Sequence, residues 1–537
     1  MDDQLLLPSL MRRAEQLYGD REVVSRLPDK ALHRYRFTDF ARRAKQLTLA
    51  LQRMGIGPGD RVATLAWNHY AHLEAYFGIP SAEAVLHTIN LRLPTDDIVY
   101  IAAHAEDRVL LVDEALLPLL EQVRERTHFE RIVVMLATKP VPDGMLDYEQ
   151  LLAAENPDEF EYPEFSERTA AAMSYTSGTT GRPKGVLYTH RALVLHSLGL
   201  ALAESEGITS RDKVMPVVPM FHVNAWGMPF VAVMMGADLV MPGPHLDPVS
   251  LIDLLERERV TVTAGVPTIW LGILSTLDNS TQRPDLTNLR SMLVGGAAAP
   301  PSMIAAFQER HGLKVIHAWG MTETSPLGTV SILPRELAAA PAEEQLLSRA
   351  RQGPPMPLVE IRARGETGVV PWDGRTPGEL EVRGPWVAKA YYRGEENDSR
   401  FTDDGWFRTG DMATIDATGS MQIQDRIKDV IKSGGEWISS VLLENALMAH
   451  PAVAEAAVVA IPDPKWQERP LACVVLRQGE SATGDELREF LGKDFPKWWL
   501  PEQYAFLQAI PKTSAGKFLK SALREQFSPA REAQGPQ

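Results

Sequence analysis

Apolar and polar residues follow two alternating periods between residue 30 and about residue 320. Short apolar runs predict strands, and the segments between them show the spacing of amphipathic helices. The predicted strands are residues 61–65, 108–112, 131–136, 170–175, 260–264, 291–294 and 314–318. Such an alternation is typical of an α/β protein, in which helices cover mostly parallel sheets.

The clearest helical pattern begins at Thr38. Its apolar positions recur every three to four residues, at Phe40, Ala44, Leu47, Leu51 and Met54. We expect Thr38 to be the N-cap and Gly55 to end the helix. Further helices are predicted at residues 246–259, 301–311, 440–450 and 484–493.

The pattern changes at about residue 353. From there to residue 424 the chain shows short strands separated by glycines, which predicts an antiparallel β subdomain. After Asp425, helix and strand signals alternate again, with a strand expected at 456–460. The expected architecture is α/β: a large N-terminal domain of layered mixed and parallel sheets with helices and a β subdomain, followed by a small α+β domain.

Residues 214–237 contain no Asp, Glu, Lys or Arg. This run is long enough to span a bilayer, but it includes several prolines, which interrupt helices. It also includes His222 and Asn224, whose polar side chains are costly in lipid. We therefore expect a buried strand, turn and helix that line an apolar site.

Composition narrows the functional classes. The chain has 45% hydrophobic and 23% charged residues, as soluble globular proteins do. A net charge of −15, without a basic patch, argues against nucleic-acid binding. The single cysteine, Cys473, cannot form an intrachain disulfide and is expected in the core. The N-terminus lacks the features of a secretory signal, so a cytoplasmic protein without integral membrane association is expected, whereas peripheral membrane contact stays open.

Residues 175–185 read Tyr-Thr-Ser-Gly-Thr-Thr-Gly-Arg-Pro-Lys-Gly and follow a predicted strand. The glycines let backbone amides turn toward a ligand, and the hydroxyls, Arg182 and Lys184 suit a polyphosphate. The spacing differs from the GxxxxGK[ST] loop of ordinary kinases and GTPases. The segment resembles the phosphate-binding loop of the adenylate-forming (AMP-binding) superfamily, which includes acyl-CoA synthetases, luciferases and the adenylation domains of peptide synthetases. The resemblance assigns ATP or AMP binding to Thr176, Ser177, Gly178, Thr179, Thr180, Gly181 and Lys184.

Residues 319–324, Trp-Gly-Met-Thr-Glu-Thr, resemble the adenine and magnesium motif of this superfamily. The resemblance implies that Trp319 and Gly320 lie beside adenine, with Trp319 in place of the Tyr of many relatives. It also implies that Thr322 binds phosphate and that Glu323 is a ligand of Mg²⁺.

A small-residue turn at 295–300 resembles the segment whose backbone lies on the other face of adenine. The residues implied there are Gly296, Ala297 and Ala298. Residues 405–411 resemble the next motif, in which Asp411 would accept hydrogen bonds from both ribose hydroxyls. Arg426 would also contact the ribose.

The hinge and the lysine motif of the superfamily come last in the chain. Lys428 falls at the hinge position, which implies an N-terminal domain of residues 1–425, a hinge at 426–428 and a lid domain at 429–537. Residues 511–517, Pro-Lys-Thr-Ser-Ala-Gly-Lys, resemble the lysine motif. Lys517 would reach the α-phosphate and the substrate carboxylate, and it joins Thr322 and Glu323 as a catalytic residue.

The segment around Phe221 bears on the choice of carboxylic acid. Relatives that adenylate amino acids have an Asp after this Phe, whereas this chain has His222, so a substrate ammonium would lack its counter-ion. Methionines in the same run offer pliable apolar walls. Residues 217–226, 431–440 and 457–462 resemble bacterial long-chain fatty acyl-CoA synthetases, in which the Trp226 position gates the fatty-acid tunnel. Medium-chain and methylthiopropionate–CoA ligases share much of this segment, so chain length stays open.

Gly434 and Gly435, after the hinge, would let the backbone approach the pantetheine arm of CoA. No carrier-protein domain follows residue 537, which favours a freely diffusing thiol. We therefore expect an ATP- and Mg²⁺-dependent ligase that joins a medium- to long-chain fatty acid to CoA through an acyl-adenylate. The alternatives are a ligase for short, sulfur-containing or aromatic acids, and a nucleotide-binding protein without catalysis. The resemblance also implies a homodimer.

Overall fold

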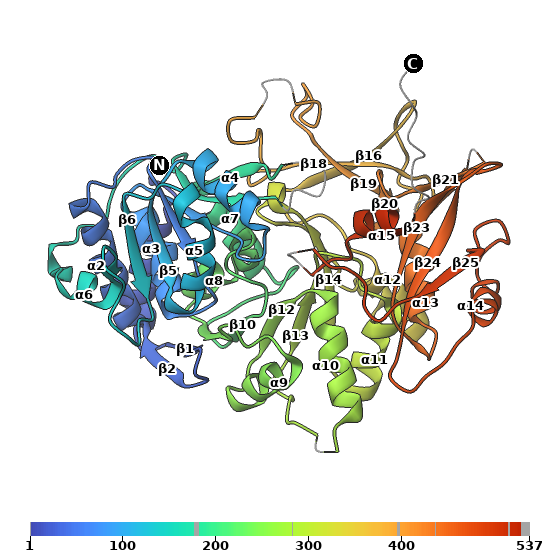
Figure 1. Cartoon of the computed structure of the whole chain (residues 1–537), viewed down its shortest axis with the longest axis horizontal. Coiled ribbons are helices and arrows are strands. Elements are labelled where there is room, and N and C mark those ends of the chain that lie inside the picture. The colour runs from blue at the N-terminus through green and yellow to red at the C-terminus, as the bar shows by residue number, and fades with distance from the viewer. Residues whose placement is uncertain are drawn as a thin grey trace.

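The computed structural model describes residues 2–176, 182–281, 283–394, 398–434, 436–513 and 516–527. It has a large N-terminal domain with mixed and parallel sheets and a smaller C-terminal domain, as the sequence predicts. In Figure 1 the C-terminal elements, in red and dark orange, lie at the right, away from the blue elements of the N-terminus.

An eight-stranded sheet forms one layer of the large domain. Its strands, in spatial order, are β15 (Leu327–Val330), β14 (Val315–Gly320), β13 (Ser291–Val294), β12 (Val262–Gly265), β10 (Lys213–Pro216), β11 (Asp238–Met241), β1 (Glu22–Arg26) and β2 (Leu32–Arg36). The strands from β14 to β1 are parallel, and β15 and β2 pair antiparallel at the two edges. The central strands are short apolar runs that are buried along their length, as parallel strands covered on both faces are.

A seven-stranded sheet forms the second layer. Its strands are β7 (Leu146–Asp147), β6 (Arg131–Met135), β5 (Asp107–Asp113), β3 (Arg61–Leu65), β4 (Val85–Thr88), β8 (Ala170–Tyr175) and β9 (Gly185–Thr189). All pair in parallel except β9, which turns back antiparallel on β8. The predicted strands at 61–65, 170–175 and 291–294 are confirmed with the same bounds.

Helices cover these two sheets. They are α1 (Leu7–Tyr18), α2 (Phe37–Arg53), α3 (Tyr70–Ser81), α4 (Thr95–Ala105), α5 (Leu117–Val123), α6 (Tyr148–Ala153), α7 (His190–Ala201), α8 (Met228–Met235), α9 (Pro248–Arg257), α10 (Pro267–Asn279), α11 (Pro301–His311) and α12 (Ala342–Ala350). The expected N-cap Thr38 is wrong, because α2 begins at Phe37 and Arg36 is the N-cap. The Asp39 carboxylate accepts the Arg36 backbone N–H at 3.2 Å, which starts the helix directly after β2.

The uncharged run 214–237 forms the predicted strand, turn and helix. The end of β10 leads into a turn at Val223–Gly227, and α8 follows. Within the described ranges of the chain, no helix is both long and apolar enough to cross a membrane.

The predicted β subdomain is confirmed as a five-stranded antiparallel sheet. Its strands are β17 (Gly368–Val369), β16 (Glu360–Gly365), β18 (Gly378–Arg383), β19 (Phe407–Ile415) and β20 (Met421–Arg426). In Figure 1 its strands run across the top of the molecule, above the eight-stranded sheet.

The smaller domain has its own sheet and apolar core. Its strands are β22 (Glu436–Ile438), β21 (Ile431–Ser433), β24 (Gln467–Leu476) and β23 (Val453–Asp463), with β25 (Gln503–Phe506) paired to β24. Its helices are α13 (Ser440–Met448), α14 (Gly484–Leu491) and α15 (Lys520–Phe527). Leu443, Val458 and Leu487 pack in one core cluster, and Cys473 is fully buried in a second. The prediction that Cys473 is a core residue is confirmed.

Candidate active site

The carboxyl ends of several parallel strands meet at one cavity of about 590 Å³. Residues that follow β10, β12, β13 and β14 line it from the eight-stranded sheet, and Thr176 lines it from the end of β8. Ligands of open α/β sheets commonly bind at this edge, because the loops after parallel strands converge there. The lining residues come from the two sheets, the β subdomain and the C-terminal domain.

Most of the predicted site residues meet at this cavity. Those that line it are Thr176, Lys184, His222, Trp226, Gly296, Trp319, Gly320, Thr322, Glu323, Arg426, Lys428 and Lys517. A second cavity of about 250 Å³ shares part of this wall and adds Ala297, Ala298 and Asp411. The predicted residues that lie outside the described ranges are Ser177, Gly178, Thr179, Thr180, Gly181 and Gly435. Gly434 lines neither cavity.

Asp411 is the centre of a buried polar cluster. The residue is 3% exposed; Oδ1 pairs with Arg426 Nε at 2.6 Å, and Oδ2 accepts a hydrogen bond from Trp319 Nε1 at 2.9 Å. The Asp411 carboxylate raises the pKa of Arg426, so the guanidinium stays charged beside it. The cluster joins β14, β19 and β20, and it fixes a carboxylate and a guanidinium at the boundary of the two cavities.

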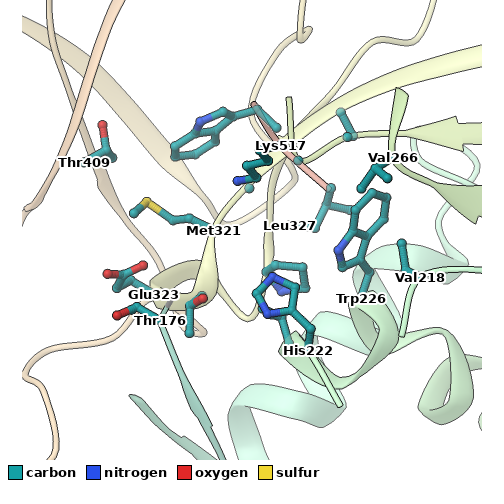
Figure 2. Close-up of a pocket in the computed structure, with 18 of the residues that line it drawn as sticks. Thr176, Val218, His222, Trp226, Val266, Met321, Glu323, Leu327, Thr409 and Lys517 are labelled. Carbon is teal, nitrogen blue, oxygen red and sulfur yellow. The ribbon is translucent and has the colours of Figure 1, made fainter. Parts of the chain in front are cut away.

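Glu323 is a buried carboxylate in the turn after β14. The Tyr391 hydroxyl donates a hydrogen bond to its Oε1 at 2.5 Å, and Arg400 Nη1 lies 3.8 Å from the same oxygen. The Ala388 backbone N–H donates to the Glu323 carbonyl at 2.8 Å, which fixes the main chain of the turn. Figure 2 shows the Glu323 carboxylate and the Thr176 hydroxyl on the same side of the cavity.

The two ends of the predicted phosphate loop are tied together. The Thr176 N–H donates to the Lys184 carbonyl at 2.9 Å, and the Lys184 N–H donates to Thr176 Oγ1 at 3.0 Å. The Lys184 ammonium pairs with Asp398 at 3.0 Å and lies 4.8 Å from the centre of the Tyr391 ring. Arg182 lies over the ring of Tyr100 at 4.9 Å. Both cations line the cavity.

Lys517 brings a charge from the C-terminal domain into a cavity built by the N-terminal domain. Its neighbour Gly516 accepts a hydrogen bond from Thr268 Oγ1 of α10 at 3.4 Å. A Cβ on Gly296 would lie 3.6 Å from Lys517 Cε, so the lysine side chain runs close to the small-residue turn. Burial and the neighbouring Arg426 guanidinium lower the pKa of Lys517 to about 8. Figure 2 shows the ammonium between Met321 on one side and Leu327 and Trp226 on the other.

The wall opposite Glu323 is apolar. Trp226 stands there with Val218, Val266 and Leu327 (Figure 2). Trp226 belongs to the turn Val223–Gly227, whose residues all have positive φ, with +56° at Trp226. A left-handed conformation costs L residues about 1–2 kcal/mol each, and such strain persists where the surrounding packing enforces it.

Close packing explains a glycine beside Trp226. A Cβ on Gly295 would lie only 3.2 Å from the Trp226 ring and 3.1 Å from the Ala318 carbonyl. A side chain at this position would force these neighbours to shift by a few tenths of an ångström, so glycine permits the close packing.

His222 faces the cavity from the turn before Trp226. Burial, with the positive charges of Lys517 and Arg92 nearby, lowers the pKa of His222 to about 4. The imidazole is neutral at pH 7 and provides no negative charge for a substrate ammonium.

Comparison with protein families shows to which family the chain belongs. The AMP-binding enzyme family matches residues 11–392, and the AMP-binding enzyme C-terminal domain matches residues 442–517. The chain belongs to the AMP-binding enzyme family. The predicted membership in the adenylate-forming superfamily is thereby confirmed.

Relatives cover the whole length of this AMP-binding enzyme. It is 52% identical over 531 residues to the long-chain-fatty-acid–CoA ligase of Thermus thermophilus, covering 98% of this chain and 96% of that one. It is 46% identical over 533 residues to the 3-methylmercaptopropionyl-CoA ligase of Ruegeria pomeroyi, covering 98% of both chains. Its fold matches the crystal structure of the anthranilate CoA ligase AuaEII in complex with anthranoyl-AMP, with a TM-score of 0.87, 24% identity and 97% of both chains covered.

Sequence reasoning missed several residues of this AMP-binding enzyme that line or support the cavity. Arg400 and Arg92 line it, and Tyr391 anchors Glu323. None of the three lies in a motif of the superfamily quoted above, and their contacts form only in the folded chain. The Trp319–Asp411 hydrogen bond had one signal in the sequence, which is the Trp at a position where many relatives have Tyr. Trp has a ring N–H donor that Tyr lacks.

Proposed function

We propose that this chain is an ATP-dependent fatty-acid–CoA ligase. It would activate a medium- to long-chain fatty acid as acyl-AMP and transfer the acyl group to CoA, with release of AMP and pyrophosphate. The observation that carries the proposal is one cavity that joins Lys517, Glu323 and Lys184 at a charged end to an apolar wall. Such a cavity suits a nucleotide triphosphate and an aliphatic acid bound together.

The charged end would hold the nucleotide. Asp411 would accept hydrogen bonds from the ribose hydroxyls, with Arg426 beside it as a further contact to the ribose. Trp319 and Gly320, on one side, and the turn of Gly296, Ala297 and Ala298, on the other, offer an aromatic and a backbone surface to adenine. Thr176 and Lys184 of the phosphate loop would bind the phosphates, together with Thr322.

Glu323 fits the binding of Mg²⁺. Magnesium is usually held by one or two carboxylates together with waters and substrate phosphates, rather than by a cage of protein ligands. Within the described residues no three His, Cys, Asp or Glu side chains come together as such a cage, and Glu323 lines the cavity as a single hard oxygen donor. When bound, the ion would neutralise phosphate charge.

Adenylation would begin with attack of a fatty-acid carboxylate oxygen on the α-phosphorus of ATP. The bond from that phosphorus to the pyrophosphate oxygen breaks, and negative charge builds up on the transferring phosphate. The protonated Lys517 would stabilise this charge, in a partly enclosed site where an ammonium is more effective than in water.

Thioester formation would follow after a change of domain orientation. We propose residues 1–425 and 429–537 as the two domains and 426–428 as the hinge, in accord with their separate apolar cores. Lys428, which lines both cavities, would be the pivot. Gly434 and Gly435 would then come to the site and admit the pantetheine arm, whose sulfur attacks the acyl carbon and displaces AMP.

The acid is proposed from the relatives and from the apolar wall. A fatty acid accords with the 52% identity to a long-chain-fatty-acid–CoA ligase and with Trp226, on the apolar wall, as the gate of a fatty-acid tunnel. The 46% identity to a 3-methylmercaptopropionyl-CoA ligase supports a short sulfur-containing acid as the second candidate.

We also propose a cytoplasmic homodimer, on the family resemblance. Size-exclusion chromatography with light scattering would test the dimer.

Release of AMP from ATP tests the function directly. The purified chain is given Mg²⁺, ATP and acids from short to long chain, with and without CoA, and 3-methylthiopropionate and benzoate serve as comparison acids. The proposal expects acid-dependent AMP release with medium- or long-chain acids, and faster turnover with CoA. Release with 3-methylthiopropionate alone would favour the second candidate, and no release with any acid would contradict a ligase.

A further inference from the structure

Arg400 lies at the charged end of the cavity, and no motif of the superfamily quoted above includes it. It precedes β19, lines the cavity with Thr176, Arg182 and Lys184, and is 33% exposed. Its guanidinium stacks on the ring of Tyr391 at 4.3 Å. Because the hydroxyl of the same tyrosine donates to Glu323, the ring holds Arg400 beside that carboxylate.

Arg400 and Lys184 share their surroundings. Both cations lie over Tyr391, and both pair with Asp398, Lys184 at 3.0 Å and Arg400 at 3.5 Å. Lys184 belongs to the predicted phosphate loop, so Arg400 is a second cation beside it that comes from a distant part of the chain. Asp398 and Glu323 lie beside these two cations, and Arg182, over the ring of Tyr100, adds a further positive charge to the same end of the cavity. A local excess of positive charge favours an anion.

The contacts of Arg400 with carboxylates are long. The distances of 3.8 Å to Glu323 and 3.5 Å to Asp398 exceed the roughly 2.7–2.9 Å of a charge-assisted hydrogen bond. By contrast, Arg426 pairs with Asp411 at 2.6 Å. A planar guanidinium whose carboxylate contacts are this long can turn its N–H groups to phosphate oxygens, which it binds in a bidentate manner.

We propose that Arg400 binds the β- and γ-phosphates of ATP and stabilises the pyrophosphate that leaves during adenylation. This inference rests on the proposed function for the position of the nucleotide. It assigns Arg400 to the polyphosphate alone, whereas Asp411 and Arg426 serve the ribose end. The side chain would leave its loose contact with Asp398 when ATP binds.

A purely structural Arg400 would instead keep Glu323 in place for Mg²⁺, and its loss would weaken ATP binding only when Mg²⁺ is present. Two measurements together separate the roles: the affinity for ATP without Mg²⁺, and the ratio of ATP affinity to AMP affinity. AMP has the ribose, the adenine and one phosphate but lacks the polyphosphate. A residue that touches only the β- and γ-phosphates therefore affects ATP and not AMP.

Equilibrium binding of ATP, with and without Mg²⁺, and of AMP to the full chain tests the proposal. We expect Arg400→Gln to weaken ATP binding by about tenfold to a hundredfold, the usual loss for one charged hydrogen-bonding group, and to change AMP binding by less than about twofold. Arg400→Lys should recover part of the ATP affinity, because lysine keeps the positive charge but cannot bind phosphate in a bidentate manner. Inorganic pyrophosphate should compete with ATP less well on Arg400→Gln than on the wild type.

Arg393→Gln is the matched control. Arg393 also stacks on a tyrosine, Tyr392 at 5.2 Å, and pairs with a glutamate, Glu106 at 2.6 Å, but it does not line the cavity. It should leave both affinities unchanged. Three results in Arg400→Gln would overturn the proposal: equal weakening of ATP and AMP, no weakening of either, or weakening of ATP only in the presence of Mg²⁺.

The outcome is separate from that of the proposed function. ATP binding does not require the right acid. If Arg400→Gln loses ATP affinity and the wild type activates no fatty acid, the role of Arg400 is supported and the ligase function is contradicted. If the wild type activates fatty acids and Arg400→Gln keeps its ATP affinity, the ligase function is supported and the role of Arg400 is contradicted.

Discussion

The two ends of the cavity are built in different ways. The charged end draws its side chains from segments far apart in the chain, such as Thr176, Glu323, Arg426 and Lys517, which come from both domains. The apolar end draws much of its wall from one continuous stretch after β10, which includes Val218, His222 and Trp226. The charged end therefore depends on domain orientation, whereas the apolar end depends on local packing within the large domain.

This difference separates the two tasks of the proposed reaction. Nucleotide chemistry would respond to changes at Lys517, which the packing of Gly516 against α10 places in the cavity. Acid selection would respond to changes at Trp226, which is fixed by the turn after β10. Substitutions at one end should leave the other task intact.

The largest effect is expected from Lys517→Ala. Loss of the ammonium should lower ATP–pyrophosphate exchange by at least about a hundredfold, because an electrostatic contact to the transition state is removed. Thioester formation from supplied acyl-AMP and CoA should be retained. Rapid-quench assays of the two half-reactions check this, and an equal loss in both would contradict the role of Lys517.

The pH dependence of adenylation should report the same lysine. With the Lys517 pKa lowered to about 8, the active ammonium is present below that pH and is lost above it. The value of kcat/KM for ATP should fall by about tenfold per pH unit above pH 8, since it reports groups of the free enzyme.

Lys517→Arg is the matched variant for this profile, since arginine stays protonated throughout the range. Whatever activity it retains should not show the fall. A wild-type profile that is flat from pH 7 to about 9.5 would contradict the assignment.

A smaller and more selective effect is expected from Trp226→Ala. Removing the indole from the apolar wall should change the ratio of kcat/KM between long- and medium-chain acids by about tenfold, as pocket contacts typically do. The KM for ATP should stay unchanged. Trp372→Ala, at a tryptophan that is 42% exposed and does not line the cavity, is the control. An unchanged preference among acids in Trp226→Ala would contradict the role of Trp226 as a gate.

Much of the fold could be predicted because its signals are local. The apolar runs at 61–65 and 291–294 are short and bounded by turn residues, and they form β3 and β13 with the same bounds. The predicted N-cap of α2 was wrong. Thr38 is a residue type that often caps helices, but α2 begins at Phe37, where the Asp39 carboxylate accepts the Arg36 backbone N–H. Such a choice depends on where β2 ends, which residue type alone does not show.

The candidate site divides along the same line. The residues of the charged end were identified because they lie in motifs, and the described ones line the two cavities. Arg400 and Tyr391 could not be identified in this way, because they matter through contacts to Glu323 across a long sequence separation. The left-handed turn before α8 could not be predicted either, because only Asn224 and Gly227 in it are residue types that favour this conformation.

Affinity for a series of stable acyl-adenylate analogues tests the central claim that one cavity holds a nucleotide and an acyl tail. In acyl sulfamates of adenosine, the nucleotide part is constant and only the chain length changes. The account predicts that affinity rises by about fourfold for each added methylene until the apolar end is filled, because each buried methylene contributes a similar free energy. Asp411→Asn should weaken all members by the same factor. Affinity that does not depend on chain length would contradict the account.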